Sequence, residues 1–382
     1  MAFEPNIEIN SLGIGTFTPS DLEAKKIHAV AREIYDSVIT DPLDHAGTLD
    51  KLESVGPEVI ECFPELAEVL SKHVSRTALK ATVLKLPMDP EAAAMLPPTP
   101  QEYLAPGENP IHLAAVPRLI AIAALGLRGY GYDSQQPFNV INNVIAIRSM
   151  AGVNGASANA SDALGLHTED ASYNLGGALL PNGEQLPEGM NLSPDWLTIN
   201  FFRNPDAIPT FIAAPDLDKL PDRLLDALYS PHFHNATNPG QQFDGNSNDS
   251  RLPVSIAYEG EAGQHYLRAN MADLSVVEGA PGVAREAYDA FLQLLQESEH
   301  DLETPPGSIV LIHNRRVLHG RRNYGGTPPR WDGADRWQQR LVATDNDGYH
   351  TRPYEVRPRI VSPHAFMQNV ERLTNEALQA AE

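Results

Sequence analysis

Two histidines and a glutamate are the residues of this sequence best suited to hold a metal ion. His167 and Glu169 are separated by one residue, and His319 lies far downstream, followed by Gly320. In a β-strand, side chains at positions i and i+2 point to the same side, so an imidazole and a carboxylate would face one point. A histidine from a neighbouring strand would complete a set that binds iron(II) on one face and leaves positions open for O2 and a chelating co-substrate. The same three ligand types also occur in catalytic zinc sites.

Two arginines downstream of the second histidine add a different chemistry. Arg336 and Arg340 lie in the segment Trp331–Arg340. A guanidinium group is a planar fork that binds a carboxylate through two hydrogen bonds. 2-Oxoglutarate carries a carboxylate at the end distant from its keto acid. An arginine beside an iron site therefore predicts a place for this co-substrate.

Four separated motifs give the sequence a specific resemblance. They are His167-Thr168-Glu169, Phe202-Arg203, Asn314-Arg315-Arg316-Val317-Leu318-His319-Gly320-Arg321 and Asp332-Gly333-Ala334-Asp335-Arg336-Trp337-Gln338-Gln339-Arg340. In this order they resemble the motifs of the clavaminate synthase-like family of iron(II)/2-oxoglutarate oxygenases, which includes amino-acid hydroxylases of antibiotic biosynthesis. The resemblance spans about residues 115–345 and implies a double-stranded β-helix core, that is, a cupin-like jelly roll.

The resemblance implies a role for each matching residue. The residues that match the iron(II) ligands, and so form the predicted catalytic centre, are His167, Glu169 and His319. Arg336 matches the arginine that holds the distal carboxylate of 2-oxoglutarate, Thr210 resembles the threonine that supports it, and Arg340 is a basic neighbour. With O2, such an enzyme converts 2-oxoglutarate to succinate and CO2. It would hydroxylate an unactivated carbon of a small polar amino acid or of an amino-acid-derived natural product.

Three residues are candidates for contact with the substrate. Gln136 resembles a glutamine that contacts substrate in the amino-acid hydroxylases, and Asp170 follows a predicted ligand directly. Asn270 stands where arginine hydroxylases of the family carry an acidic residue for the guanidinium group. This departure makes a guanidinium substrate less expected. In a second departure, His313 replaces the aspartate that usually precedes Asn-Arg-Arg.

Three alternative functions remain open at this point. The same cofactor chemistry could desaturate or cyclise a substrate instead of hydroxylating it. A zinc-dependent hydrolase could use the same ligands, but the helical His-Glu-x-x-His pattern of zinc proteases is absent, and this function gives no reason for Arg336 and Thr210. A non-catalytic binding protein on the same scaffold is disfavoured because the ligand set is intact.

The elements that must position these residues can be predicted from the spacing of apolar residues. Residues 1–106 are expected to form a helical region packed on the core, with a capping box at Ser20-Asp21-Leu22-Glu23. Helices are predicted at about 57–74, 111–127 and 282–298. Residues 107–365 are expected to form the mainly β core, with strands at 140–148, 196–203, 210–214, 254–258, 308–313 and 337–344. Residues 234–251 are predicted to form a lid, and residues 366–382 a C-terminal helix.

Composition excludes several classes of function. The 382 residues carry 28 Lys and Arg against 50 Asp and Glu, a formal charge of −22. This balance disfavours binding to nucleic acid and to anionic membranes. The single cysteine, Cys62, excludes an intrachain disulfide and any cysteine-based metal cluster. Without a recognisable signal segment before Lys25, the expected location is the cytoplasm, while the oligomeric state stays open.

Overall fold

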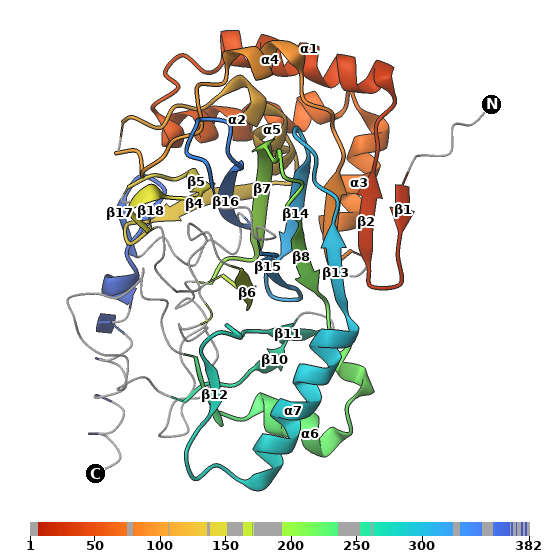
Figure 1. Ribbon diagram of the computed structural model, residues 1–382, viewed down its shortest axis with the longest axis vertical. Coiled ribbons are helices and arrows are strands. Elements are labelled where there is room, and N and C mark those ends of the chain that lie inside the picture. Colours follow the sequence, from red (N-terminus) through yellow and green to blue (C-terminus); the bar gives the residue numbers. More distant parts are fainter. Residues whose placement is uncertain are drawn as a thin grey trace.

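Two β-sheets that pack against each other form the centre of the molecule (Figure 1). In spatial order, the large sheet consists of β1 (Ile7–Ile9), β2 (Ile14–Phe17), β3 (Ala81–Leu84), β14 (Ile309–His313), β7 (Trp196–Arg203), β16 (Trp337–Asp345), β4 (Leu127–Tyr132), β18 (Ile360–Val361) and β17 (Glu355–Arg357), with β5 (Asn142–Ile145) also paired to β16. The small sheet consists of β13 (Glu299–Leu302), β8 (Thr210–Ala213), β15 (Leu318–Arg321) and β6 (Leu164–His167). Together they form the jelly-roll core that the resemblance predicts.

This arrangement is taken from a computed structural model. It describes residues 7–74, 79–105, 107–135, 138–150, 163–169, 171, 193–235, 253–260, 263–323, 329–345 and 354–366, with scattered positions thereafter. Residues 236–251 of the predicted lid and most of the predicted C-terminal helix lie outside the described residues.

Helices of the N-terminal part cover one face of the large sheet (Figure 1). They are α1 (Asp21–Ser37), α2 (His45–Ile60), α3 (Pro64–Val74), α4 (Pro90–Met95), η1 (Leu113–Ala115) and α5 (Val116–Ala124). The predicted capping box at the start of α1 is confirmed, because the Glu23 amide donates to Ser20 Oγ and the Ser20 amide donates to the Glu23 carboxylate. Leu119 of α5 packs with Trp337 and Leu341 of β16, so one side of this strand belongs to the helix-covered core.

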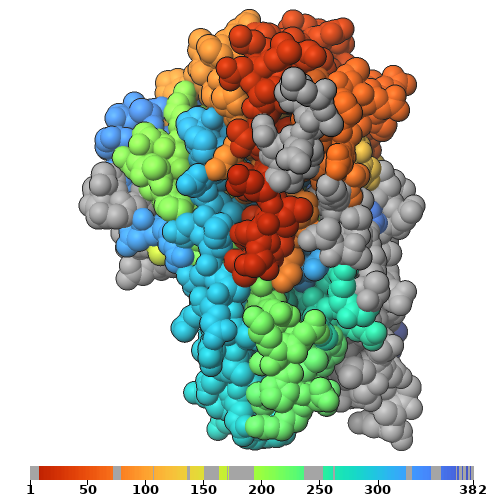
Figure 2. Space-filling view, turned by 90° about the vertical axis from the view of Figure 1, so that its right-hand side faces the viewer, coloured from red at the N-terminus to blue at the C-terminus, as the bar shows by residue number. Residues whose placement is uncertain are grey.

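The opposite end of the molecule is built on the small sheet. Here α6 (Asp222–Tyr229) and α7 (Gly282–Glu297) pack against apolar residues of β6, β8 and β15. Figure 2 shows the N-terminal helices, in red and orange, at the top of the molecule and α6 and α7, in green and cyan, at the bottom. Smaller elements are the pairs β9 (Phe233–Asn235) with β12 (Leu274–Val276) and β10 (Ala257–Glu259) with β11 (His265–Leu267), and the short helices η2 (Arg148–Met150) and η3 (Leu217–Lys219).

The N-terminal region differs from its predicted helical character. It contributes β1, β2 and β3 to the large sheet, where β3 pairs antiparallel with β14. All four residues of β3 are buried, and their antiparallel partners in β14 follow more than two hundred residues later in the chain. A short buried strand of this kind has neither helical nor alternating periodicity. Its presence therefore depends on a partner that local sequence does not reveal.

The predicted helix at 57–74 is wrong in its bounds. Pro57 lies inside α2, which begins at His45 and ends at Ile60. A short non-helical segment then precedes α3, which begins at Pro64. Proline favours the first turn of a helix because its missing N–H needs no partner there. The helix predicted at 111–127 ends earlier, at Ala124, because Gly126 adopts a positive φ of 67° that leads into β4. The strand predicted at 254–258 begins later, as β10 at Ala257, and ends one residue beyond the prediction, while Val254 forms only an isolated bridge with Phe233.

Candidate metal centre

The three predicted metal ligands lie together between the two sheets. Donor atoms of His167, Glu169 and His319 all fall within 4.8 Å of one another. His319 Nε2 is 3.5 Å from Glu169 Oε1, and the two imidazole centres are 4.3 Å apart. Pairing of β15 with β6 places His319 directly opposite His167. Two imidazoles and one carboxylate converging on one point fit a single iron(II) ion that keeps further positions open.

The local geometry of the His-Thr-Glu motif differs in part from the predicted strand. β6 ends at His167, and Glu169 lies in the turn that follows. Thr168 is turned away from the metal ligands, as the alternation predicts: its amide donates to the Ala269 carbonyl at 2.8 Å, and its hydroxyl accepts from the Ala269 amide at 3.3 Å. Glu169 therefore reaches the site from a turn, and contacts outside the strand ladder must hold it there.

The ligands have protonation states that suit a metal ion. His167 Nδ1 donates to the Gly165 carbonyl at 2.9 Å, which leaves Nε2 for coordination. Burial and the nearby His319 lower the pKa of His167 to about 4, against the opposing effect of Glu169. Burial disfavours the charged form of Glu169, but the Arg340 guanidinium and both imidazoles outweigh it and hold the pKa of this carboxyl well below its usual range. Metal ligation requires a neutral imidazole and an ionised carboxylate.

A cavity opens beside these ligands. Its walls include Leu197 and Ile199 of β7 together with Arg336, Gln338 and Arg340. Because side chains alternate along a strand, Gln338 and Arg340 of β16 face the cavity together with Arg336, which directly precedes the strand, whereas Trp337 and Leu341 face the helices. The alternation of one strand thus brings both predicted arginines to the metal ligands.

Arg336 and Thr210 meet in this cavity, as the sequence predicts for a co-substrate site. Arg336 is only 2% exposed, and its Nη2 donates to Thr210 Oγ1 at 3.4 Å. Gln338, which the sequence analysis did not single out, also donates to Thr210 Oγ1 at 3.5 Å. The signal that could have identified Gln338 is its position midway between Arg336 and Arg340, at the spacing of two residues that places side chains on one side of an extended segment.

Arg340 contacts a different part of the cavity. Its Nη1 donates to both carboxylate oxygens of Glu169, at 2.9 and 3.1 Å, and its Nη2 donates to Gln135. The sequence predicts Arg340 beside the co-substrate arginine, but its hydrogen bonds connect it to the carboxylate of Glu169 instead. It both balances the charge of Glu169 and limits the orientations of that side chain.

The predicted substrate residues have different outcomes. The side-chain Nδ2 of Asn270 donates to Asp273 Oδ2 at 2.8 Å, and its side-chain Oδ1 accepts from the backbone amide of Ala272 at 3.3 Å. Asn270 thus holds its own turn opposite His167 and does not line the cavity as described. Gln136 and Asp170 lie outside the described residues. The departure at His313 is explained by packing, because its ring lies against Trp196 at 4.5 Å.

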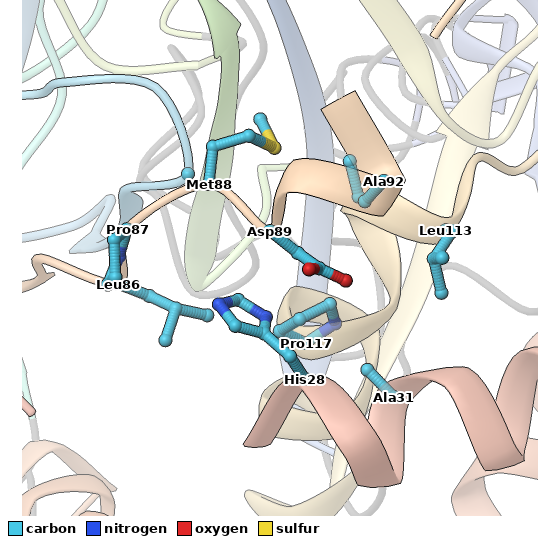
Figure 3. Close-up of a pocket in the computed structure, with 11 residues that line it drawn as sticks. His28, Ala31, Leu86, Pro87, Met88, Asp89, Ala92, Leu113 and Pro117 are labelled. Carbon is cyan, nitrogen blue, oxygen red and sulfur yellow. The ribbon is translucent and has the colours of Figure 1, made fainter. Parts of the chain in front are cut away.

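A second cavity lies between α1, α4 and the segment before α4 (Figure 3). His28 and Asp89 are its ionisable lining residues, and Arg32 already binds Asp89 at 3.3 Å. Within the described part of the chain, only His167, Glu169 and His319 form a group of three potential metal ligands. The cavity at the metal ligands is therefore the candidate functional site.

Comparison with known proteins supports the same chemistry. Residues 210–341 match the family described as taurine catabolism dioxygenase TauD, TfdA family. The chain is 27% identical over 365 residues to an L-ornithine/L-arginine 3-hydroxylase of Catenulispora acidiphila, covering 84% of this chain and 95% of that protein. It is 32% identical over 130 residues to an L-asparagine oxygenase of Streptomyces coelicolor, covering 34% and 36% of the two chains.

Solved structures show the same fold. An asparagine oxygenase bound to Fe(II), 3-hydroxyasparagine and succinate superimposes with a TM-score of 0.71 at 21% identity, covering 91% of this chain and 99% of that one. The non-haem iron oxygenase OrfP, bound to Fe and α-ketoglutaric acid, has a TM-score of 0.69 at 23% identity with the same coverage. The zinc-dependent hydrolase alternative finds no support in these similarities. Among the described residues, no helix has the length and apolar character needed to cross a bilayer.

Proposed function

Because the chain belongs to the iron(II)/2-oxoglutarate-dependent oxygenases, we propose that it hydroxylates an unactivated carbon of a small polar amino acid, free or within an amino-acid-derived natural product. The observation that carries the proposal is the shared cavity, in which His167, Glu169 and His319 lie together with the Arg336–Thr210 pair. The three ligands would bind the metal ion, and the Arg336–Thr210 pair suits a carboxylate at a distance from that ion.

In this proposal, His167, Glu169 and His319 hold iron(II). The bound iron and 2-oxoglutarate supply the activation of O2, and the protein supplies binding and orientation. Arg336 and Thr210 bind the distal carboxylate of the co-substrate. Burial of Arg336, which is 2% exposed, strengthens this contact because water screens a buried charge less.

The charge of the cavity supports an anionic group on the substrate as well. Arg321, Arg336 and Arg340 all line it, and Glu169 is the acidic residue among the described lining residues. A bound iron(II) ion would add two positive charges to this lining, so that 2-oxoglutarate, with two negative charges, leaves positive charge for the α-carboxylate of an amino acid. The named activities of the similar proteins, on ornithine, arginine and asparagine, favour the same substrate class.

The test is a survey of amino acids with the purified protein, iron(II), 2-oxoglutarate and O2. We expect at least one amino acid to gain one oxygen atom by mass spectrometry, with stoichiometric formation of succinate. A product that has instead lost two hydrogens would indicate desaturation or cyclisation. His319→Ala should abolish both products because it removes a ligand. Succinate formation that no amino acid or derivative stimulates would argue against the proposed substrate class.

A further inference from the structure

A buried asparagine holds the backbone of Glu169. Asn314 lies in the turn between β14 and β15 and is 0% exposed. Its Oδ1 accepts the Glu169 amide at 2.7 Å, and its Nδ2 donates to the Glu169 carbonyl at 3.3 Å. The same Nδ2 donates to the Pro194 carbonyl at 3.0 Å and lies 3.5 Å from Ser193 Oγ. One side-chain amide therefore binds both polar groups of the Glu169 backbone and the segment that enters β7.

These contacts matter because the strand ladder does not reach Glu169. β6 ends at His167, and the next backbone hydrogen bond of this segment joins the Thr168 amide to the Ala269 carbonyl. Arg340 limits the carboxylate end of the side chain. Asn314 holds the backbone of Glu169. The backbone amide of Asn314 in turn donates to the Asp195 carbonyl at 2.8 Å. A glutamate in a turn would otherwise adopt many orientations, and fixing them costs conformational entropy when the metal binds.

We propose that Asn314 is a positioning residue for the metal centre, and that it connects the turn that carries Glu169 to the strand that carries His319. His319 follows Asn314 on the strand that starts after the same turn. The turn thus leads into the strand that carries one ligand, and it holds the backbone of another. An amide suits this role because it offers an acceptor and a donor in one planar group. Aspartate keeps the acceptor but cannot donate to the Glu169 carbonyl, and leucine offers neither.

The inference rests on the proposed metal ligands but not on the proposed substrate. It is tested with cobalt(II) as the probe, titrated into the metal-free protein without amino acid or co-substrate. We expect Asn314→Asp and Asn314→Leu to weaken cobalt(II) binding by about 10- to 100-fold, the usual cost of losing a partner that orients a ligand. The KM for 2-oxoglutarate should change much less than kcat, because Arg336 and Thr210 are untouched.

Asn200→Asp is a matched control for general destabilisation. Asn200 is equally buried, at 0% exposed, and donates to the Ser308 carbonyl at 3.3 Å. It lies one position from Ile199 on β7, and so on the side of the strand away from the cavity. We expect this variant to lose thermal stability while keeping the cobalt(II) affinity of its folded fraction.

These outcomes distinguish a role of Asn314 in positioning a metal ligand from a general contribution to stability. Wild-type cobalt(II) affinity in Asn314→Asp would overturn the proposal, as would an equal loss of affinity in Asn200→Asp. If Asn314→Leu does not fold, the nearly isosteric Asn314→Asp variant still decides the question. Normal cobalt(II) binding by a wild-type protein that hydroxylates no amino acid would refute the proposed function and leave this inference intact.

Discussion

Arg336 offers the sharpest test of the co-substrate site. Its guanidinium is almost fully buried, lies 3.4 Å from Thr210 Oγ1 and shares a cavity with the three metal ligands. Arg336→Gln removes the charge and the planar fork but keeps a polar side chain of smaller size. A hydrogen bond to a charged group contributes about 1.5–3 kcal/mol. The affinity for 2-oxoglutarate should therefore fall by about 10- to 150-fold.

The assay is the KM for 2-oxoglutarate, measured from succinate formation, together with a cobalt(II) titration of the same variant. Metal affinity should stay at the wild-type value because no ligand has changed. Arg336→Lys should fall between the wild type and Arg336→Gln, since lysine keeps the charge but cannot bind a carboxylate as a fork. Arg322→Gln is the control, because Arg322 pairs with Asp301 and Glu299 away from the cavity. A wild-type KM in Arg336→Gln would refute the assignment.

Three further predictions concern positioning, pH and stability. Thr99 holds the turn before Arg336, because its hydroxyl donates to the Asp335 carbonyl at 2.8 Å. Thr99→Val should thus raise the KM for 2-oxoglutarate by about 5- to 10-fold, the equivalent of one hydrogen bond, and an unchanged KM would show that the turn holds itself. Burial and Arg203 lower the pKa of His112 in the folded protein to about 4 from 6.5. The unfolded chain therefore binds more protons as the pH falls below 6.5, and stability is lost from there down to about pH 4. His112→Phe should lose about 2 kcal/mol less than the wild type between about pH 7.5 and pH 5, as measured by urea unfolding, and equal losses would contradict this. Ser20→Ala should lower stability by about 0.5–2 kcal/mol by removing the cap of α1, with kcat unchanged, and a wild-type midpoint of unfolding would contradict it.

Sequence patterns were sufficient to predict the elements that depend only on neighbouring residues. The capping box at Ser20 needs only four neighbouring residues, and it forms as predicted. The predicted strand at 196–203 coincides with β7, and the predicted helix at 282–298 ends one residue later than α7. Their apolar periodicity records which side of each element is buried. The residue types of the metal centre were also readable, because the chemistry of the ligands restricts them to imidazole and carboxylate.

Other features depend on partners that are distant in sequence. Asn270 could have faced a substrate, but in the fold its side chain binds Asp273 and the turn around it. Arg340 could have joined the co-substrate site, but the turn after β6 brings Glu169 within hydrogen-bond distance of it. Neither choice follows from spacing along the chain, because each is decided by which group lies nearest in space.

The sequence by itself determined the chemistry of this protein: which residues can bind a metal, which can bind a carboxylate, and in what order they occur. The tertiary structure decided how they are held. Pairing of β15 with β6 sets His319 opposite His167, and the turn at Asn314 reaches Glu169 through a side-chain amide. Ligand types are a property of residues, whereas the convergence of their donor atoms is a property of strand register and of contacts between turns, which only the folded chain brings together.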